Sequence, residues 1–325
     1  IIPPLTSSVF AYGIRKGQFR LLISSSIKSQ ELAAHQERER LELLEKVSDY
    51  NYHYQIKVKD LLNAIDTLKS SVKIPVIDIL RRVTASFSHS SCAIEGNTLA
   101  IQDTRGIWEK LKKNNLDILL KDRKLPLPGP RSLSDKSEYE VIEVRNHLLS
   151  TYLVSKFAEL EREINLDDIK DIHRVLLRDT PMEKFEWEDE INYAGEFRKI
   201  EVMASHAHLT VYTYPQEVPA LMKRFIEFRD ESIKNKSLHP LIIASRIFSS
   251  FNHVHPFVDG NGRVARSIMV YHLIHNGYPP IVFQHMTPGL MATCLYMAQA
   301  AQRLAHSLSW HATDERGKIC LLQEK

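Results

Sequence analysis

The sequence predicts a mainly α-helical protein, a helical bundle that contains one β-hairpin and is preceded by an N-terminal helical region. Strong helix formers with apolar residues at helical spacing run along most of the 325 residues. Proline and glycine stand at the ends of these segments rather than inside them. The β-favouring runs gather in one stretch, residues 198–215. Together these features indicate a helical fold with a single local hairpin.

The individual helices follow from this spacing. Pro75 suits the first turn of one helix, "VIDILRRVTASFSH", because proline lacks the N–H that a first turn leaves unpaired. Gly277 and the two prolines after Tyr278 predict the end of the last strongly patterned helix. Between 198 and 215, "IEVM" and "LTVYTY" are joined by small and polar residues, which is typical of a hairpin. The further helices are expected over residues 30–47, 59–68, 138–157, 165–177, 217–233 and 239–254.

The expected domain organisation follows from one proline-rich linker, residues 121–138, which has three prolines among its charged residues. We expect an N-terminal helical extension over residues 1–74 and a helix with its linker over residues 75–130. The main domain is expected over residues 131–312, followed by a tail over residues 313–325.

Composition excludes several classes of protein. A formal net charge of +3, with basic residues dispersed, argues against a nucleic-acid partner. The three cysteines lack CxxC spacing, which argues against a zinc site or disulfide framework and favours a reducing compartment such as the cytoplasm. No apolar run is long enough for a spanning helix, and the first residues lack the layout of a signal peptide. The chain begins without Met, so an upstream membrane anchor or lumenal targeting signal stays open.

One stretch carries the chemistry: "HPFVDGNGRVAR", residues 255–266. Glycines between two helices let backbone N–H groups converge on an anion, and the N-terminus of the second helix favours negative charge. Arg263 and Arg266 lie three residues apart in its first turn, where cations oppose the helix dipole unless an anion compensates them. A phosphate bound by Gly260, Gly262 and the two arginines would do so.

Two further residues of this stretch suit phosphate chemistry. Asp259 precedes the glycines, where a single carboxylate can hold Mg²⁺ together with phosphate oxygens and water. His255 can take a proton from an incoming hydroxyl.

Three simpler interpretations compete with a phosphate site. A calcium loop requires a bidentate Glu where the chain has Val270. A metal pair at His253 and His255 has no accompanying ligand set. A structural turn accounts for the glycines but not for the histidine, aspartate and paired arginines together.

Residues 255–266 resemble the signature of Fic-domain proteins at every specified position. Residues 192–203 with 212–222 resemble the Fic flap, a hairpin that aligns the target chain. "DIHRVLL" and "NGYPPI" are similar to flanking helix segments of the same family, so the resemblance covers residues 131–310. The family implied is that of the eukaryotic-type Fic adenylyltransferases.

A second element, "SCAIEGN" at residues 91–97, resembles the inhibitory pattern of Fic proteins whose autoinhibitory helix precedes the core. The resemblance implies an inhibitory role for Glu95 with Ser91, Gly96 and Asn97, in which Glu95 pairs with Arg266 and blocks the γ-phosphate. Without the resemblance, the same stretch is a helix that ends at Gly96 with a solvated Glu95.

The resemblance further implies transfer of AMP from ATP to a Ser, Thr or Tyr hydroxyl of a target protein, with Mg²⁺, or Mn²⁺, as the metal. His255 and Asn261 would be catalytic, with His255 as the base and Asn261 in the anion hole. Asp259 would bind the metal. The remaining implied nucleotide contacts are Gly260, Gly262, Arg263, Arg266 and Val202, and Tyr296 and Gln299 are the nearest polar candidates for the adenine.

Removal of AMP supported by Glu95 and a homodimer through the Fic domain are also implied. Two alternatives stay open at this point. One is transfer of another phosphate-containing group, and the other is a nucleotide-gated binding module that captures a partner strand.

Overall fold

In the computed structural model, the residues whose structure is described are 58–121, 136–160, 162–205, 209–235 and 238–283. The helix expected over residues 30–47, most of the linker, both ends of the expected 131–312 domain, the tail, Tyr296 and Gln299 lie outside these ranges. Residues 58–71 form a helix, as predicted, which belongs to a different unit from the helices described below. The other described residues belong to a second unit, and it contains the site. None of the described helices is both long and apolar enough to span a membrane.

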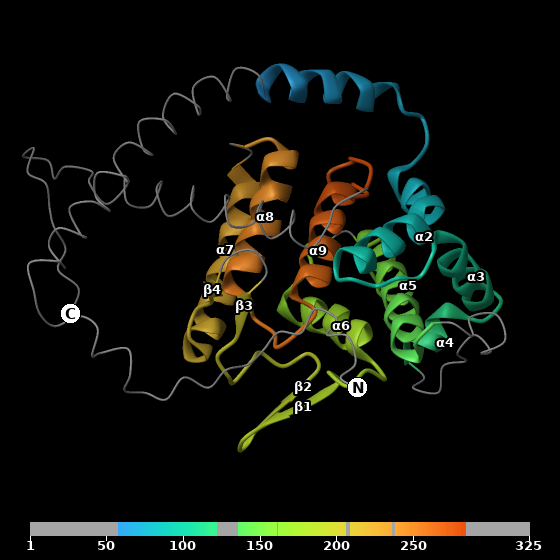
Figure 1. Cartoon of the computed structure of the whole chain (residues 1–325). Helices are drawn as coiled ribbons and strands as arrows, with labels where there is room; N and C mark the ends of the chain where they lie inside the picture. Colours follow the sequence, from blue (N-terminus) through green and yellow to red (C-terminus); the bar gives the residue numbers. More distant parts are fainter. Residues whose placement is uncertain (1–57, 122–135, 161, 206–208, 236–237, 284–325) are drawn as a thin grey trace, which may run out of the picture. The chain divides into compact units, whose positions relative to one another are not determined.

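The second unit is built from helices and two short hairpins (Figure 1). The helices are α2 (Val76–Ile94), α3 (Ile101–Lys112), α4 (Leu116–Lys121), α5 (Glu138–Ala158), α6 (Leu166–Leu177), α7 (Val218–Asn235), α8 (Pro240–Val254) and α9 (Asn261–His275). The strands are β1 (Lys184–Trp187), β2 (Glu190–Tyr193), β3 (Met203–Ser205) and β4 (Leu209–Val211), with a short 3-10 turn at Pro215–Glu217. The predicted fold class, mainly α with a hairpin, is confirmed.

Local sequence signals fix the helix ends. The Ser137 hydroxyl accepts from the Glu140 N–H, and the Glu140 carboxylate accepts from the Ser137 N–H, which is a capping box at the start of α5. At the end of α2, Gly96 has φ +96°, a conformation that glycine adopts without a steric penalty. The Gly96 and Asn97 N–H groups then donate to the carbonyls of Ala93 and Cys92, which is a Schellman motif. The predicted helix end at Gly96 is therefore confirmed.

Helix α9 occupies the centre of this unit and contacts α2, α5, α6 and α8. One of its faces packs into a cluster with α6, α7 and α8 through Val264, Ala265 and Ile268. Another face joins a cluster with α2 through Val270 and Leu273. A helix that is apolar on most sides belongs in a core, so the polar residues of its first turn are placed in a buried, rigid setting.

Helix α2 belongs to the same packed body as the signature residues. Side chains from α2, α3, α4 and α5 form one apolar cluster, which includes Cys92, Ile107, Leu119 and Leu148. Helices on both sides of the boundary expected at residue 130 contribute to this cluster. Proline-rich composition indicated a chain excursion, whereas burial of the apolar faces determined which helices pack together.

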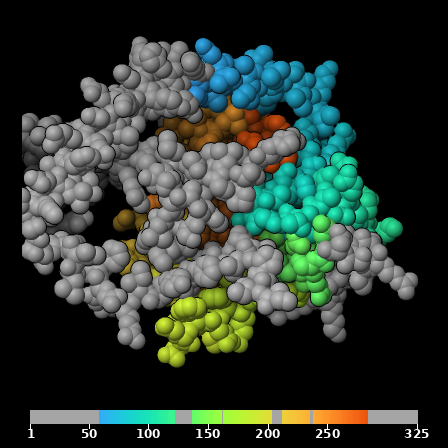
Figure 2. Space-filling view, in the orientation of Figure 1, coloured from blue at the N-terminus to red at the C-terminus, as the bar shows by residue number. Residues whose placement is uncertain are grey.

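The predicted hairpin is present but short, since β3 pairs antiparallel with β4 from Met203↔Val211 to Ser205↔Leu209. A second hairpin, β1–β2, was not predicted. Its register runs from Lys184↔Tyr193 to Trp187↔Glu190 around a tight turn in which Glu188 has φ +52°. Figure 2 shows it in yellow-green, projecting from the surface, where Trp187 and Tyr193 are exposed. Acidic residues are dense in this segment, and "KFEW" alternates over only four residues, so the sequence gives a weak strand signal.

Candidate functional site

The signature loop connects α8 to α9 through two residues with positive φ. His255 ends α8 with φ +50°, and Gly260 precedes α9 with φ +76°. Helix α9 already begins at Asn261, so Gly262 lies in its first turn. The expectation that Gly260, Asn261 and Gly262 all form the loop is therefore corrected. The first turn of a helix leaves N–H groups without helical partners, so the start of α9 is suited to an anion. Glu95, at the end of α2, lies close to this turn at Gly262.

The Asn261 side chain closes the loop on itself. Its Oδ1 accepts from the Phe257 N–H at 2.9 Å and its Nδ2 donates to the Phe257 carbonyl at 2.8 Å. The side chain is 2% exposed. Both of its polar atoms are therefore used within the loop, and the structure supports a positioning role for Asn261. Its predicted place in an anion hole stays a prediction.

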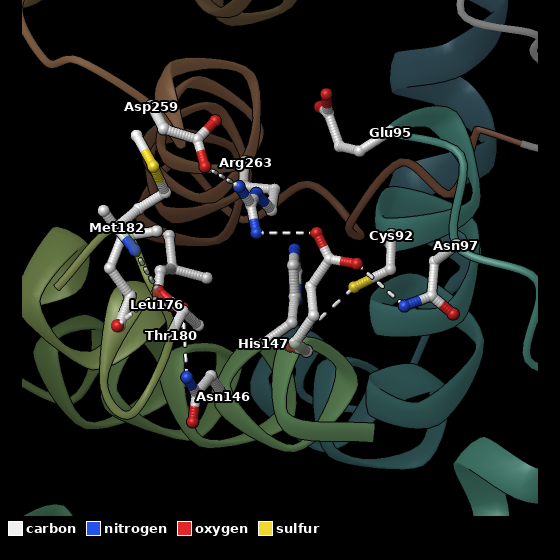
Figure 3. Close-up of polar contacts among 12 residues, drawn as sticks. Cys92, Glu95, Asn97, Asn146, His147, Leu176, Thr180, Met182, Asp259 and Arg263 are labelled. Carbon is white, nitrogen blue, oxygen red and sulfur yellow. Dashed lines mark hydrogen bonds and ion pairs between the residues drawn. The ribbon is translucent and has the colours of Figure 1, made fainter. Parts of the chain in front are cut away.

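The Arg263 guanidinium is compensated by two carboxylates rather than by one phosphate. Nη1 donates to Glu143 Oε1 at 2.7 Å, and Nη2 donates to Asp259 Oδ2 at 3.0 Å. Figure 3 shows Arg263 lying between Asp259 and the carboxylate that also contacts Asn97. Burial raises the pKa of Glu143, an effect that Arg263 and Asn97 oppose. Glu143, on α5, was not predicted from the sequence.

The Arg266 guanidinium faces the end of α2. Nη2 donates to Glu95 Oε1 at 2.6 Å, and Nε donates to Ser91 Oγ at 2.7 Å. Nη2 also donates to the Ser91 carbonyl at 3.0 Å. Arg266 is 1% exposed, and these acceptors compensate a charge that would otherwise be costly to bury. The Glu95–Arg266 pair that the resemblance implied is present, and the Glu95 side chain is 28% exposed.

The second glycine of the signature is required by the approach of Glu95. A Cβ at Gly262 would lie 2.7 Å from Glu95 Oε1 and 3.1 Å from Arg266 Nη1. The first separation is shorter than real Cβ contacts show, and the second is tighter than most of them. A carboxylate from α2 therefore lies where the first turn of α9 offers its amides.

Asn97 ties the end of α2 to α5. Its Nδ2 donates to Glu143 Oε2 at 2.7 Å and to the Glu140 carbonyl at 3.0 Å. Gly96 provides the positive φ that turns the chain toward this contact. Of the predicted inhibitory residues, Ser91 and Glu95 contact α9 through Arg266, whereas Asn97 contacts α5.

A cavity of about 40 Å³ remains between α2, α5 and the loop. It has room for a few water molecules and none for a triphosphate. It is lined by Glu95, Gly96, Asn97, Tyr139, Glu140, Glu143, Asp259 and Arg263. Most of these side chains are acidic, so the space is polar but crowded by carboxylates.

His255 lies under the hairpin segment that follows β4. Its ring stacks on Tyr212 with ring centroids 3.7 Å apart. Nδ1 lies 3.3 Å from the Asn252 carbonyl, which can only accept, so Nδ1 carries the proton and Nε2 keeps a lone pair. Burial lowers the pKa of His255 to about 3, where titration near neutrality was expected. The imidazole is therefore neutral over the physiological range and ready to accept a proton.

Arg198 joins the base of the hairpin to the signature loop. Its N–H donates to the Pro256 carbonyl and its Nε donates to the His255 carbonyl at 2.7 Å. Its guanidinium also donates to the carbonyls of Ile200 and Thr213, which flank the hairpin on either side. Val202, expected to contact the nucleotide, is 2% exposed at the start of this hairpin.

His173 supports the loop from below. Its Nδ1 accepts from the Gly195 N–H at 2.7 Å, so Nε2 carries the proton and donates to the Asp259 carbonyl at 3.0 Å. Its ring stacks on Phe257 at 3.8 Å. Burial lowers the pKa of His173 to about 3, which keeps it neutral. A histidine within "DIHRVLL" gave no sequence signal of this role.

Asp259 is the residue that would hold a metal ion. Its carboxylate is 22% exposed at the mouth of the loop and contacts Arg263. Among the described residues, no three His, Cys, Asp or Glu side chains converge on a point that could hold a metal. A single accessible carboxylate fits Mg²⁺ only when phosphate oxygens and water complete the octahedral shell.

This combination of a helical body, an anion-suited α9 N-terminus and a hairpin over a neutral histidine agrees with the comparisons with known proteins. Residues 163–273 match the Fic/DOC family. This match places a Fic/DOC domain within residues 163–273.

Among curated relatives, a protein adenylyltransferase Fic from Drosophila grimshawi is 30% identical over 227 residues. That match covers 69% of this chain and 39% of the relative. The protein of the same name from Drosophila willistoni is 31% identical over 201 residues, 61% of this chain and 34% of the relative. The chain thus spans about two fifths of the length of these relatives.

Solved structures show the same fold. A Fic-1 fragment from C. elegans is 22% identical with a TM-score of 0.59, and the match covers 78% of this chain and 68% of that chain. A Fic-domain-containing signaling protein from Bacteroides thetaiotaomicron is 20% identical with a TM-score of 0.52, over 77% and 94% of the two chains.

Proposed function

We propose that this protein is a Fic-type adenylyltransferase that transfers AMP from ATP to a hydroxyl of a target protein. The observation that carries the proposal is the convergence of a neutral His255, Asp259 and two buried arginines on the N-terminus of α9. The name of the curated relatives, protein adenylyltransferase Fic, supports the same activity. A Ser, Thr or Tyr side chain is the acceptor that fits a general base at His255.

The reaction displaces pyrophosphate. The hydroxyl oxygen of the target attacks the α-phosphorus of ATP, its proton passes to Nε2 of His255, and the bond to the β-phosphate oxygen breaks. Arg263 and Arg266 would contact the phosphates, and first-turn N–H groups of α9 would stabilise charge on the transferring group. Positioning and electrostatics supply most of the acceleration in transfers of this kind.

Asp259 is the residue for Mg²⁺, with Mn²⁺ as a substitute. The bound ion would neutralise phosphate charge. Arg263 donates to the Asp259 carboxylate, so it keeps that carboxylate near the proposed phosphate position.

Glu95 would inhibit the forward reaction. Its carboxylate occupies the partner position of Arg266 that a γ-phosphate would take, and the adjoining cavity is too small for a triphosphate. When Glu95 orients a water molecule instead, the same site could support removal of AMP.

The test is labelling with α-³²P-ATP and Mg²⁺ of wild type, Glu95→Gly and His255→Ala. We expect strong auto-labelling by Glu95→Gly, weak labelling by wild type and none by His255→Ala, since loss of a general base costs about 10²–10⁴ in rate. Undiminished labelling by His255→Ala would contradict the role given to that residue.

A parallel reaction with γ-³²P-ATP tests transfer of a different phosphate group. Binding of ATP without transfer of either label to the protein or to cell lysate would reduce the function to a nucleotide-gated binding module.

A further inference from the structure

Arg266 is bound to α2 by more than the Glu95 ion pair. Its Nε donates to the Ser91 hydroxyl at 2.7 Å, and its Nη2 donates to the Ser91 carbonyl at 3.0 Å. These contacts do not depend on Glu95. If Glu95 moved away, Ser91 would still fix the plane of the guanidinium.

The Ser91 hydroxyl is itself held by a fully buried histidine of α5. His147 Nε2 lies 2.7 Å from Ser91 Oγ, and His147 Nδ1 lies 3.2 Å from Ser88 Oγ. His147 is 0% exposed. Figure 3 shows the imidazole rising from α5 toward the region between α2 and Arg263. No carboxylate makes a hydrogen bond to its ring among the contacts recorded for the described residues.

Donor and acceptor roles in this chain follow from valence. A guanidinium only donates, so Ser91 Oγ must accept from Arg266, and its single proton is left for His147 Nε2. His147 then carries its own proton on Nδ1 and donates to Ser88. Burial, with Arg266 and Arg263 close by, lowers the pKa of His147 to about 3 and keeps Nε2 an acceptor.

The acceptor Nε2 of His147 matters because a serine hydroxyl inside a helix can also donate to the backbone of its own helix. Such a hydroxyl can donate to the carbonyl four residues earlier, which for Ser91 is that of Phe87. Thr84 does this on the same helix, donating to the Leu80 carbonyl at 2.8 Å. A Ser91 hydroxyl turned to Phe87 would lie in a different rotamer and would leave Arg266 Nε without its acceptor.

We propose that His147 is a positioning residue. By accepting from Ser91, it orients Arg266 for phosphate even when Glu95 has withdrawn. This inference rests on the proposed function, in which Arg266 binds an ATP phosphate. It divides the end of α2 into two parts: Glu95 competes with the nucleotide, and Ser91 with His147 prepares Arg266 to receive it.

The experiment compares four substitutions in the Glu95→Gly protein: His147→Leu, His147→Gln, Ser91→Ala and Thr84→Ala. The Kd for ATP with Mg²⁺ is measured by isothermal titration calorimetry, and the auto-labelling rate is measured at saturating ATP. Leucine has no acceptor, whereas the glutamine oxygen can take the place of Nε2. Thr84→Ala removes a buried hydroxyl of α2 that touches neither Ser91 nor Arg266, so it controls for loss of stability.

We expect His147→Leu and Ser91→Ala to raise the Kd about tenfold, because a hydrogen bond to a charged group is lost. The saturated auto-labelling rate should stay within about twofold. His147→Gln and Thr84→Ala should keep the parent Kd even if their melting temperatures fall. If His147→Leu does not fold, Ser91→Ala and His147→Gln carry the test.

A parent-like Kd for Ser91→Ala or for folded His147→Leu would overturn the proposal. A Kd for His147→Gln as weak as that for Ser91→Ala would do so too. If the Glu95→Gly protein binds ATP without labelling, the adenylyltransferase assignment fails, while the comparison of Kd values still decides the role of His147. Absence of any ATP binding would overturn both.

Discussion

The Glu95 carboxylate and the backbone of Gly262 occupy adjoining space, since a Cβ at position 262 would lie 2.7 Å from Glu95 Oε1. Glu95, at the end of α2, and the first turn of α9 are thus fitted closely to each other. The position has no unusual φ, so helix geometry does not demand glycine there. Glycine is favoured at this position because the Glu95 carboxylate lies so close to it.

Gly262→Ala should therefore break the Glu95–Arg266 pair without producing an active site. The methyl would also crowd Arg266 Nη1, at 3.1 Å, and would cover the amides that a phosphate needs. We expect Glu95→Gly to bind ATP tightly, and the double variant with Gly262→Ala to bind at least about tenfold more weakly, because an arginine contact to phosphate is charge-assisted. Equal Kd values for these two proteins in calorimetry would count against the argument.

Glu95→Gln separates charge from shape. Its amide oxygen can still accept from Arg266, but a neutral acceptor is worth about 1 kcal/mol less than a charged one. We expect an ATP affinity and an auto-labelling rate between those of wild type and Glu95→Gly. Labelling as strong as that of Glu95→Gly would show that charge alone excludes the nucleotide, whereas wild-type labelling would show that occupancy of the space is sufficient.

Arg198 links His255 to both ends of the β3–β4 hairpin, and a lysine cannot reproduce its planar set of donors. Arg198→Lys should leave buried carbonyls unpaired, at a cost of about 1–3 kcal/mol in stability for each. The auto-labelling rate in the Glu95→Gly background should fall more than the ATP affinity, because Arg198 holds the backbone of His255, the proposed general base. Lys199→Arg, a change at an exposed neighbour, should alter neither quantity.

The parts of the fold that local chemistry fixes could be predicted from the sequence. The helix of residues 166–177, the capped start of α5 and the end of α2 at Gly96 all depend on residues within a few positions of each other. The pairing of Glu95 with Arg266 spans 171 residues, and it was expected only because a family motif links the two positions. Periodicity carried no information about it.

The supporting residues could not be predicted for the same reason. Glu143, His147 and His173 each look like ordinary members of amphipathic helices, and their roles come from what lies opposite them after folding. Glu143 lies 120 positions from its partner Arg263. The β1–β2 hairpin was missed for a different reason. Its acidic residues obscured the alternation of β1, and β1 has only four residues, too few for the alternation to be decisive.

The free energy of unfolding should fall steeply as the pH drops below neutrality. His147, His173 and His255 each have a folded pKa of about 3, whereas the pKa of an unfolded histidine is about 6.5. A lowered folded pKa gives stability that is present above about pH 6.5 and is lost as pH falls toward the folded value. Each histidine contributes a slope of up to about 1.4 kcal/mol per pH unit.

Urea unfolding at pH 7.5, 6.0 and 5.0 measures this slope directly. His147→Leu should reduce the slope by roughly one quarter, since one of four such histidines no longer takes up a proton on unfolding. The fourth is His272, whose pKa burial lowers to about 4. The raised pKa of Glu143 acts in the opposite sense, because its contribution is lost as pH rises through that pKa. A free energy of unfolding that does not change between pH 7.5 and 5.0 would contradict the burial of these rings.

Asn261→Asp tests whether the loop geometry depends on the hydrogen-bond donor of the Asn261 amide, because aspartate has nearly the same shape but lacks that donor. Aspartate keeps the oxygen that accepts from the Phe257 N–H, but it replaces the Nδ2 donor with an oxygen facing the Phe257 carbonyl. The ionised aspartate is buried and leaves the Phe257 carbonyl without a donor, so the substitution should lower the free energy of unfolding by about 2–4 kcal/mol. Protonation restores a donor, so the pKa of the new carboxyl should be raised.

The direction in which the stability deficit changes with pH distinguishes loss of this donor from a general loss of loop structure. Above the raised pKa the deficit relative to wild type is full, and it shrinks as pH falls through that pKa, because the protonated carboxyl can donate to Phe257. Asn261→Ala lacks both contacts and should show the same deficit at pH 7.5 and pH 5.0. The difference in free energy of unfolding from wild type at each pH is the measurement, and a deficit of Asn261→Asp that grows at pH 5.0 would show that the Phe257 contacts do not determine the loop.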